Sequence, residues 1–310
     1  MKDNLIIGTR GSKLALFQAN LVKSKLSSLF PEISITLKVL KTKGDKLINQ
    51  PLISVLDKGF FTKEIQEELH NNKIDLAVHS LKDLPTELPK YSTIGAVLSR
   101  EDHRDVFLSL KSRQLKDFTY EDIIGTSSFR RTSQLLNINS NLNIQPIRGN
   151  VDTRIQKMLD GEYTGLVMAA AGVKRLGLEG YITEYFDINT MLTAPGQAAI
   201  AIEIRNNDMQ VLELTSQIND FHTQICTNAE RDFLHALNGG CQVPFAAYAK
   251  IENHNIQLDA LVSSLDGKKL VRETINGTLD SANQLGVKIA KLILSKGGDD
   301  IINQLKSLNY

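Results

Sequence analysis

The sequence predicts an α/β protein with two similar lobes, followed by a small α+β domain at the C-terminal end. Over the first two thirds of the chain, short apolar runs alternate with segments of helical periodicity. A four-residue motif occurs once in each lobe, and from about residue 221 the pattern changes to a helix and then successive strands. The chain has 310 residues, 42% hydrophobic and 23% charged, which is enough for two or three domains.

The first lobe is expected to begin with a buried strand from Asn4 to Thr9 and a helix from Ser12. Ile33 to Leu40 alternates apolar and polar residues, as a strand does. Thr62 is expected to cap a helix that runs to about His70, and a buried strand follows from Ile74 to His79. This alternation predicts a mainly parallel sheet.

The second lobe repeats the order of the first. Ile123-Ile124-Gly125-Thr126 matches Ile6-Ile7-Gly8-Thr9, and small polar residues, an arginine and a helix follow both. A strand that ends at Arg148, a helix from Val151 to Asp160 and a strand from Gly165 to Ala169 come next. A four-residue match alone can arise by chance, but the shared order of elements favours two similar lobes.

Two segments are expected to carry the chain between the lobes. The charged residues 100–105 lead out of the first lobe, and Thr193 to Gln197 leads back to an apolar strand from Ala199 to Ile204. That strand is expected to join the first sheet, which gives the double crossing of a two-lobed binding protein. The predicted domains are 1–99 with 199–217, then 104–193, then 221–310.

The third domain is predicted to combine helices with antiparallel strands. A helix from Asn228 to Leu237 is expected to end at Asn238-Gly239-Gly240. A closing helix places Leu285 and Ile289 on one face. The three predicted strands span 245–251, 256–262 and 270–275.

Composition argues against several classes of protein. A net charge of +1, 6% aromatic residues and no tryptophan argue against binding to nucleic acid or to a membrane surface, so any anion site is local. The six histidines show no metal-ligand spacing, and the two cysteines form no CxxC pair. Neither a signal-peptide pattern nor an apolar run of about 20 residues is present. We therefore expect a cytoplasmic protein without a metal. A monomer is a further expectation, which composition does not address.

Basic and polar residues gather where strands are predicted to end. Ligands of open α/β sheets lie beyond the carboxyl ends of the strands, beside helix N-termini. Six of the twelve arginines lie there, and arginine suits two-pronged binding of carboxylate or phosphate. For any single arginine, a solvated helix surface is the alternative. The residues at these positions are Arg10, Ser12, Lys82, Thr126, Ser128, Arg130, Arg131, Arg148, Arg154 and Arg175.

Asp83 and Cys241 are candidates for the chemistry itself. Asp83 can donate a proton to a leaving amine or stabilise a cation, but from the residues alone an ion pair or helix cap is favoured. Cys241 lies between two glycines and Pro244, in a loop expected to present a nucleophilic thiol. An unreactive buried thiol is its alternative, and is our interpretation of Cys226. His79 is interpreted as structural.

Six short segments, in order along the chain, carry a resemblance to a known family. They are Thr9–Ser12 with Gln18, Val78–Asp83, Gly125–Arg131, Arg148–Arg154, Ala171–Leu178 and Gly239–Pro244. Each is weak alone, but the set in this order is specific. The chain resembles the hydroxymethylbilane synthase (porphobilinogen deaminase) family over essentially its whole length.

The resemblance implies two lobes like those of periplasmic binding proteins and a third domain that bears the cofactor. It implies that four porphobilinogen molecules are condensed, with loss of ammonia, on a dipyrromethane primer held by Cys241 as a thioether, and that hydrolysis releases a linear tetrapyrrole. It implies that Asp83 is the catalytic carboxylate and that the ten basic and polar residues above bind acetate and propionate groups. Lys58 matches the family's mobile loop over the site.

Three positions depart from the family pattern. Asp152 stands where glycine is frequent, and we expect it to face outward, because an acid in the cleft would repel substrate carboxylates. His103 replaces a common proline, and residues 193–200 contain fewer glycines than in many relatives. The two departures near the crossings bear on hinge mobility more than on chemistry.

Two other functions remain open at this point. A non-catalytic protein that binds a small carboxylate would explain the arginines, but not the glycine-flanked Cys241 or the third domain. Binding of nucleic acid through the arginines conflicts with the near-zero net charge and the few aromatic residues.

Overall fold

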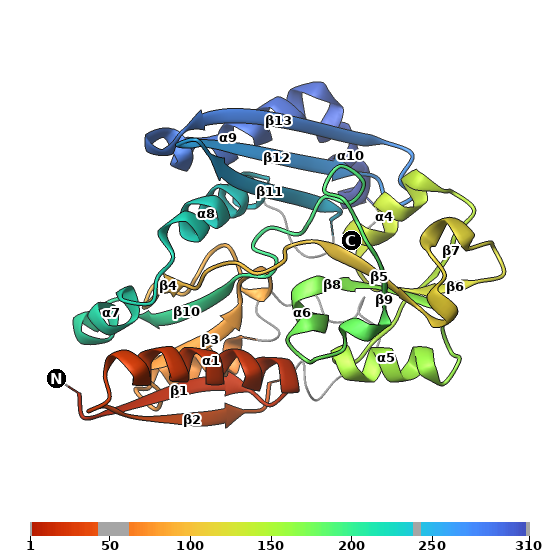
Figure 1. Ribbon diagram of the computed structural model, residues 1–310. Helices are drawn as coiled ribbons and strands as arrows, with labels where there is room; N and C mark the ends of the chain where they lie inside the picture. Colours follow the sequence, from red (N-terminus) through yellow and green to blue (C-terminus); the bar gives the residue numbers. More distant parts are fainter. Residues whose placement is uncertain (1, 43–61, 238–242, 308–310) are drawn as a thin grey trace. The chain divides into compact units, whose positions relative to one another are not determined.

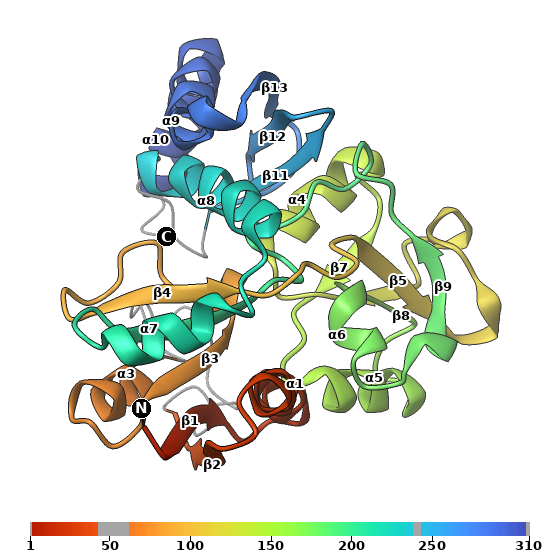
Figure 2. The same cartoon turned by 60° about the vertical axis from the view of Figure 1, so that its left-hand side comes forward.

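The computed structural model describes residues 2–42, 62–237 and 243–307. These residues form three sheets (Figures 1 and 2). The chain divides into two compact units, Met1–Glu101 with Ala198–Gln224, and Asp102–Gln197 with Ile225–Tyr310. The first unit contains the first lobe, and the second contains the second lobe and the C-terminal domain.

The first lobe is a five-stranded sheet in the order β2-β1-β3-β10-β4. Its strands are β1 (Asn4–Arg10), β2 (Ser34–Leu40), β3 (Leu76–Ser80), β4 (Ser92–Val97) and β10 (Ile200–Arg205). Its helices are α1 (Lys13–Leu29), α3 (Lys63–His70) and α7 (Met209–Ser216), with a 3-10 turn at Leu81–Asp83. Side chains of α1 and α7 pack on one face of the sheet, where Ile7 lies, and those of α3 pack on the other, where Ala77 lies.

The second lobe is a five-stranded sheet in the order β7-β6-β8-β5-β9. Its strands are β5 (Asp105–Ser109), β6 (Ile123–Gly125), β7 (Asn143–Gln145), β8 (Gly165–Ala169) and β9 (Ile182–Tyr185). Its helices are α4 (Phe129–Ile138), α5 (Val151–Leu159) and α6 (Ala170–Lys174). Leu135 of α4 packs with Ile124 on one face, and α5 and α6 pack on the other with Leu166.

The two sheets match strand for strand, which confirms the prediction of two similar lobes. β1 and β6 occupy equivalent places, and they carry the recurring Ile-Ile-Gly-Thr motif. The glycine of each motif has the same reason to be there. A Cβ atom on Gly8 would lie 2.3 Å from the Ile74 side chain, and one on Gly125 would lie 2.7 Å from the Leu166 side chain. The motif therefore recurs because it solves the same packing problem twice.

The prediction of mainly parallel sheets is confirmed for four of the five strands in each sheet, which run in one direction, but one strand in each sheet runs the opposite way. β10 runs antiparallel to β3 and β4, and β5 runs antiparallel to β8 and β9. In each lobe the antiparallel strand at this place directly follows a segment that carries the chain from one unit to the other. The prediction that the strand near residue 200 joins the first sheet is confirmed by β10.

Two local predictions also need correction. The strand expected to end at Arg148 ends at Gln145, because Pro146 has no N–H to continue the ladder. α3 begins after Thr62 as predicted, but the Thr62 side chain makes no capping bond with the helix backbone. Its hydroxyl instead donates to Gln66 Oε1 at 3.4 Å.

The C-terminal domain is a three-stranded antiparallel sheet, as predicted, packed on helices. Its elements are α8 (Phe221–Ala236), β11 (Phe245–Glu252), β12 (Asn255–Ser263), β13 (Leu270–Thr278), α9 (Ala282–Ile293) and α10 (Asp299–Ser307), with a π-helical turn at Leu294–Gly298. The helix α8 begins at Phe221 rather than Asn228. Among the described residues, no helix is long and apolar enough to cross a membrane.

The C-terminal domain is fastened to α4 of the second lobe. Ser263 Oγ donates to Ser133 Oγ at 2.7 Å, and Asn137 Nδ2 donates to the carbonyl of Gly267 at 2.8 Å. Gly267 has a φ of 70°, and a Cβ atom there would lie 2.2 Å from the Ser133 carbonyl oxygen. Glycine at this position therefore allows the tip of the β12–β13 hairpin to approach the helix backbone closely.

Candidate active site

In the first lobe, the predicted site residues lie at one edge of the sheet. Arg10 is the last residue of β1, and Lys82 and Asp83 form the turn after β3. β1 and β3 are adjacent and parallel, so their carboxyl ends face the same way. Ser12 caps α1, and its Oγ accepts a hydrogen bond from the N–H of Ala15 at 3.2 Å.

The turn that carries Asp83 is tied down on both sides. Ser80 Oγ and the Gln18 side chain exchange hydrogen bonds of 2.8 and 3.2 Å, and the N–H of Leu81 donates to the carbonyl of Ala199 at 3.0 Å. Asp83 is exposed, and it makes neither an ion pair nor a capping bond with any residue that the structure describes. The structural alternative for this carboxylate therefore finds no support among those residues.

In the second lobe, the predicted site residues follow three neighbouring strands. β6 lies between β7 and β8 and runs parallel to both, so all three carboxyl ends share one edge. Arg154 Nε donates to the carbonyl of Gly149 at 2.8 Å, and Gly149 has a φ of 117°, which favours glycine. In chain order, the residues at this edge are Thr126, Ser128, Arg130 and Arg131 after β6, Arg148 and Arg154 after β7, and Arg175 after β8.

Arg130 and Arg131 are buried, 5% and 7% exposed, and both pair with Asp105. Nη1 of Arg130 donates to Asp105 Oδ2 at 2.6 Å and to the carbonyl of Leu192 at 2.8 Å. Nε and Nη2 of Arg131 donate to Asp105 Oδ1 at 3.1 and 2.8 Å, and its Nη1 donates to the carbonyl of Val167 at 3.0 Å. Two guanidinium groups share one carboxylate, so these three side chains carry a net charge of +1.

Sequence reasoning missed Asp105 and Gln197. Gln197 Nε2 donates to Asp105 Oδ1 at 3.0 Å and to the carbonyl of His103 at 2.8 Å. Burial raises the pKa of Asp105, but the charges of the two arginines and the bond from Gln197 lower that pKa by more, so the carboxyl is ionised. A usable signal was the apolar run 106–108 after Asp105, because an acid that begins a buried strand needs partners.

A second buried carboxylate, also missed, lies in the first lobe. Glu203 of β10 is fully buried and accepts hydrogen bonds from Ser92 Oγ at 2.6 Å and Gln66 Nε2 at 3.0 Å. Its Oε2 lies 3.1 Å from His79 Nε2. Burial raises the pKa of Glu203, but the contacts with His79, Ser92 and Gln66 lower it by more. His79 is thus part of the lobe interior, in keeping with its structural interpretation.

The remaining predicted residues have mixed placements. Cys241 and Lys58 lie outside the described residues. Asp152 is half-buried in the first turn of α5, and Cys226 is buried in the core of the C-terminal domain. The ring of His103 stacks on Tyr248 of β11, with 4.0 Å between centroids, so this departure from the family pattern has a packing partner.

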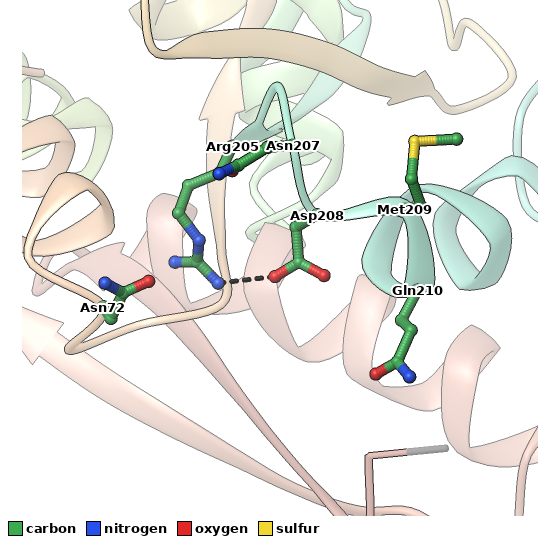
Figure 3. A pocket seen from close by; sticks show the side chains of 6 residues that line it. All are labelled: Asn72, Arg205, Asn207, Asp208, Met209 and Gln210. Atoms are coloured by element: carbon green, nitrogen blue, oxygen red, sulfur yellow. Dashed lines mark hydrogen bonds and ion pairs between the residues drawn. The ribbon is translucent and has the colours of Figure 1, made fainter.

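Figure 3 shows a surface pocket of the first unit that lies apart from these residues. Arg205 pairs there with Asp208 at 2.6 Å and donates to the carbonyls of Leu69 and Ile74. Because β10 runs antiparallel to β3, Arg205 lies at the opposite end of the sheet from Asp83. The pocket is lined by Asn72, Arg205, Asn207, Asp208, Met209 and Gln210.

Comparison with known proteins decides the family. Residues 5–213 match the family model described as porphobilinogen deaminase, dipyromethane cofactor binding domain, and residues 224–295 match porphobilinogen deaminase, C-terminal domain. The porphobilinogen deaminase of Syntrophomonas wolfei subsp. wolfei is 46% identical over 299 residues, 96% of this chain and 98% of the relative. That of Lawsonia intracellularis is 42% identical over 305 residues, 98% of this chain and 99% of the relative. The chain belongs to the porphobilinogen deaminase family.

Membership of the family confirms several predictions from sequence. The chain has hydroxymethylbilane synthase function in tetrapyrrole biosynthesis and is a transferase, EC 2.5.1.61. Porphobilinogen is its substrate, and dipyrromethane is its cofactor. The two alternative functions are therefore set aside.

A solved structure resembles the chain only weakly. The periplasmic aliphatic sulphonate binding protein SsuA from Escherichia coli is 12% identical, with a TM-score of 0.39, over 76% of this chain and 70% of that chain. A likeness at this level carries no argument about fold or ligand. The assignment of two α/β lobes rests on the matching strand orders.

Proposed function

We propose that the carboxyl edges of the two lobe sheets bind the carboxylates of porphobilinogen, of the cofactor and of the growing chain. The observation that supports this is the placement of the arginines at or beyond the carboxyl ends of β1, β6, β7 and β8, where open α/β sheets receive ligands. Each porphobilinogen adds two carboxylates, so a lengthening chain needs many cationic partners. In this proposal Arg10, Ser12, Lys82, Thr126, Ser128, Arg130, Arg131, Arg148, Arg154 and Arg175 supply them.

Asp83 has the catalytic role in this proposal. Its exposed carboxyl group protonates the aminomethyl nitrogen of porphobilinogen as the C–N bond breaks and ammonia leaves. As a carboxylate it then stabilises the positive charge that remains on the pyrrole. The bonds that hold the turn through Ser80 and Leu81 keep the group in place for both steps.

The described residues fit a cofactor that carries carboxylates. Dipyrromethane supplies the primer to which the pyrroles are joined, and Cys241 is proposed to hold it through a thioether. The net positive charge of Asp105, Arg130 and Arg131 suits an anionic group at the N-terminal end of α4. The cysteine precedes β11 of the domain that is fastened to this same helix, which supports a short tether.

The proposed thioether between Cys241 and dipyrromethane is tested by intact-protein mass spectrometry of two cysteine variants. Cys241→Ala is expected to lack the mass of two pyrrole units, because no other residue is proposed to form the thioether. Cys226→Ala, the matched control, is expected to carry that mass, because Cys226 is buried in the domain core. A Cys241→Ala protein that still carries the full adduct contradicts the assignment.

Several finer predictions belong to the same proposal. The protein is predicted to be a cytoplasmic monomer that binds neither nucleic acid nor a membrane. Lys58 is predicted to belong to a loop that overlies the site. The three-domain boundaries predicted from the sequence also remain a proposal. Light scattering of the purified protein tests the monomer, since a dimer would double the mass of 34.4 kDa.

A further inference from the structure

Asp105 lies at the ligand-facing edge of the second-lobe sheet. It pairs with Ala169, the last residue of β8, and its backbone carbonyl accepts a hydrogen bond from the N–H of Phe186 at 3.0 Å. β8 lies beside β6, whose carboxyl end leads into Thr126 and α4. The buried carboxylate is therefore at the same edge as the residues proposed to bind carboxylates.

Asp105 holds the two arginines to different extents. Nε and Nη2 of Arg131 donate to its carboxylate, and the third nitrogen, Nη1, donates to the Val167 carbonyl, so the whole guanidinium group is fixed. Arg130 is held through Nη1 alone, and its Nε and Nη2 take no part in these bonds. Arg131 is thus held through three nitrogens and Arg130 through one, so the Arg131 guanidinium group is the more firmly fixed of the two.

Gln197 connects this cluster to the chain crossings. Its side chain is fully buried and bridges Asp105 to the carbonyl of His103, which lies on the other crossing segment. The N–H of Gly196 donates to Glu230 Oε2 at 2.7 Å, and Glu230 Oε1 accepts from the N–H of Ala249 in β11. The backbone that presents Gln197 is therefore itself fixed to the C-terminal domain.

We propose that Asp105 is a positioning residue for substrate, which with Gln197 fixes the guanidinium groups of Arg130 and Arg131 in the orientation that binds a substrate carboxylate. This inference rests on the proposed function. Asp105 itself does not touch the ligand. It acts by setting the direction of the arginine N–H groups, because two-pronged binding of a carboxylate depends on the plane of the guanidinium group.

Charge and orientation make opposite predictions for Asp105→Asn. The substitution removes the negative charge, so the cluster changes from +1 to +2, and attraction alone would tighten the binding of an anionic substrate. Loss of orientation instead weakens binding. The sign of the change in KM for porphobilinogen therefore separates the two effects.

The test compares three variants as holoenzymes. Asp105→Asn removes the charge, and Gln197→Met removes one hydrogen-bond donor to Asp105 while keeping a similar volume. Asp122→Asn is the matched control, because Asp122 also pairs with an arginine of the second lobe, Arg113, away from α4. KM and kcat for porphobilinogen are measured, with kcat divided by the adduct-bearing fraction from intact mass.

The expected results are a KM raised about tenfold in Asp105→Asn and about threefold in Gln197→Met, with kcat per loaded enzyme changed less than KM. Asp122→Asn is expected to keep KM within about twofold of wild type. A KM that falls or stays constant in Asp105→Asn overturns the positioning role. If Asp105→Asn does not fold, an unchanged KM in Gln197→Met overturns it.

Failure of this inference is distinguishable from failure of the proposed function. Wild-type protein that carries no two-pyrrole adduct contradicts the proposed function. Wild-type protein that carries the adduct, alongside positioning variants that keep a normal KM, contradicts only the role of Asp105.

Discussion

The two lobes share one architecture but bury their carboxylates in different surroundings. Glu203 of β10 and Asp105 of β5 lie on equivalent strands of sheets with the same order. Glu203 pairs with Ala77, near the beginning of β3, and its partners are a hydroxyl, an amide and an imidazole. Asp105 pairs with the last residue of β8, and its partners include two guanidinium groups.

The two lobes therefore share their strand order but differ in where the buried acid lies and in which groups it contacts. In the first lobe the buried acid ties α3, β3, β4 and β10 together inside the sheet. In the second lobe the buried acid lies at the sheet edge where we propose that carboxylates bind, and its two arginines leave an excess positive charge there. The strand order is the same in both lobes, and so is the close packing at the glycine of the repeated motif. The groups that surround the buried acid differ, because Glu203 and Asp105 stand at different positions along their strands.

The largest expected effect concerns the exposed acid of the first lobe. Asp83→Asn is expected to lower kcat by about a thousandfold with the fold intact, because the amide can neither give up a proton nor carry a negative charge. Asp3→Asn, another exposed acid of the same unit, is the control and is expected to keep normal turnover. A near-normal rate for Asp83→Asn in a steady-state assay contradicts its catalytic role.

The next prediction sharpens the contrast within the arginine pair. Arg131→Lys removes the guanidinium group that donates hydrogen bonds to Asp105 and to the Val167 carbonyl. The free energy of unfolding is therefore expected to fall by about 2–4 kcal/mol. Arg130→Lys keeps a charge near Asp105, so we expect a smaller loss of stability, but a higher KM for porphobilinogen. Denaturant unfolding and kinetics of both variants check this, and equal losses of stability would contradict the division of roles.

A smaller effect is expected from the acid inside the first lobe. Glu203→Gln keeps the side-chain volume but replaces the carboxylate that accepts hydrogen bonds from Ser92 and Gln66 with a neutral amide. The free energy of unfolding is therefore expected to fall by about 1–3 kcal/mol. Chemical denaturation measures this loss. A variant as stable as wild type would show that the cluster does not hold the lobe together.

The smallest effect is a dependence of stability on pH. The hydrogen bonds from Arg113 lower the pKa of Asp122 from 3.8 to about 2. A lowered carboxyl pKa stabilises the fold above the unfolded value, so this contribution is present above about pH 4 and is lost as the pH falls through about 2. Asp122→Asn is expected to be about 1 kcal/mol less stable than wild type near pH 6, with the gap closing near pH 2. An equal gap at both pH values contradicts this account.

The fold was predictable where the signal is local. The Ile-Ile-Gly-Thr motif predicted two equivalent strands, and an apolar run interrupted only by Glu203 predicted β10. The strand predicted to end at Arg148 is shorter in the structure, because Pro146 has no N–H with which to continue the ladder. The antiparallel direction of β5 and β10 depends on the path of the chain between units, which no short segment encodes.

The candidate site was predictable in part for the same reason. Arginines at the ends of strands, or in the loop or helix that follows a strand, could be placed from the strands themselves. Asp105 could not, because its charged neighbours suggested a solvated segment and its partners Arg130 and Gln197 are 25 and 92 residues away in sequence. The apolar run 106–108 pointed to a buried acid, but only the folded chain shows which groups pair with it.

The most direct test of the contrast between the lobes is the KM for porphobilinogen of Asp105→Asn and Glu203→Gln, measured side by side. The account predicts a rise of about tenfold for Asp105→Asn and a change within about twofold for Glu203→Gln, since only the first acid orients carboxylate-binding groups. Equal changes in the two variants, in either direction, would contradict it.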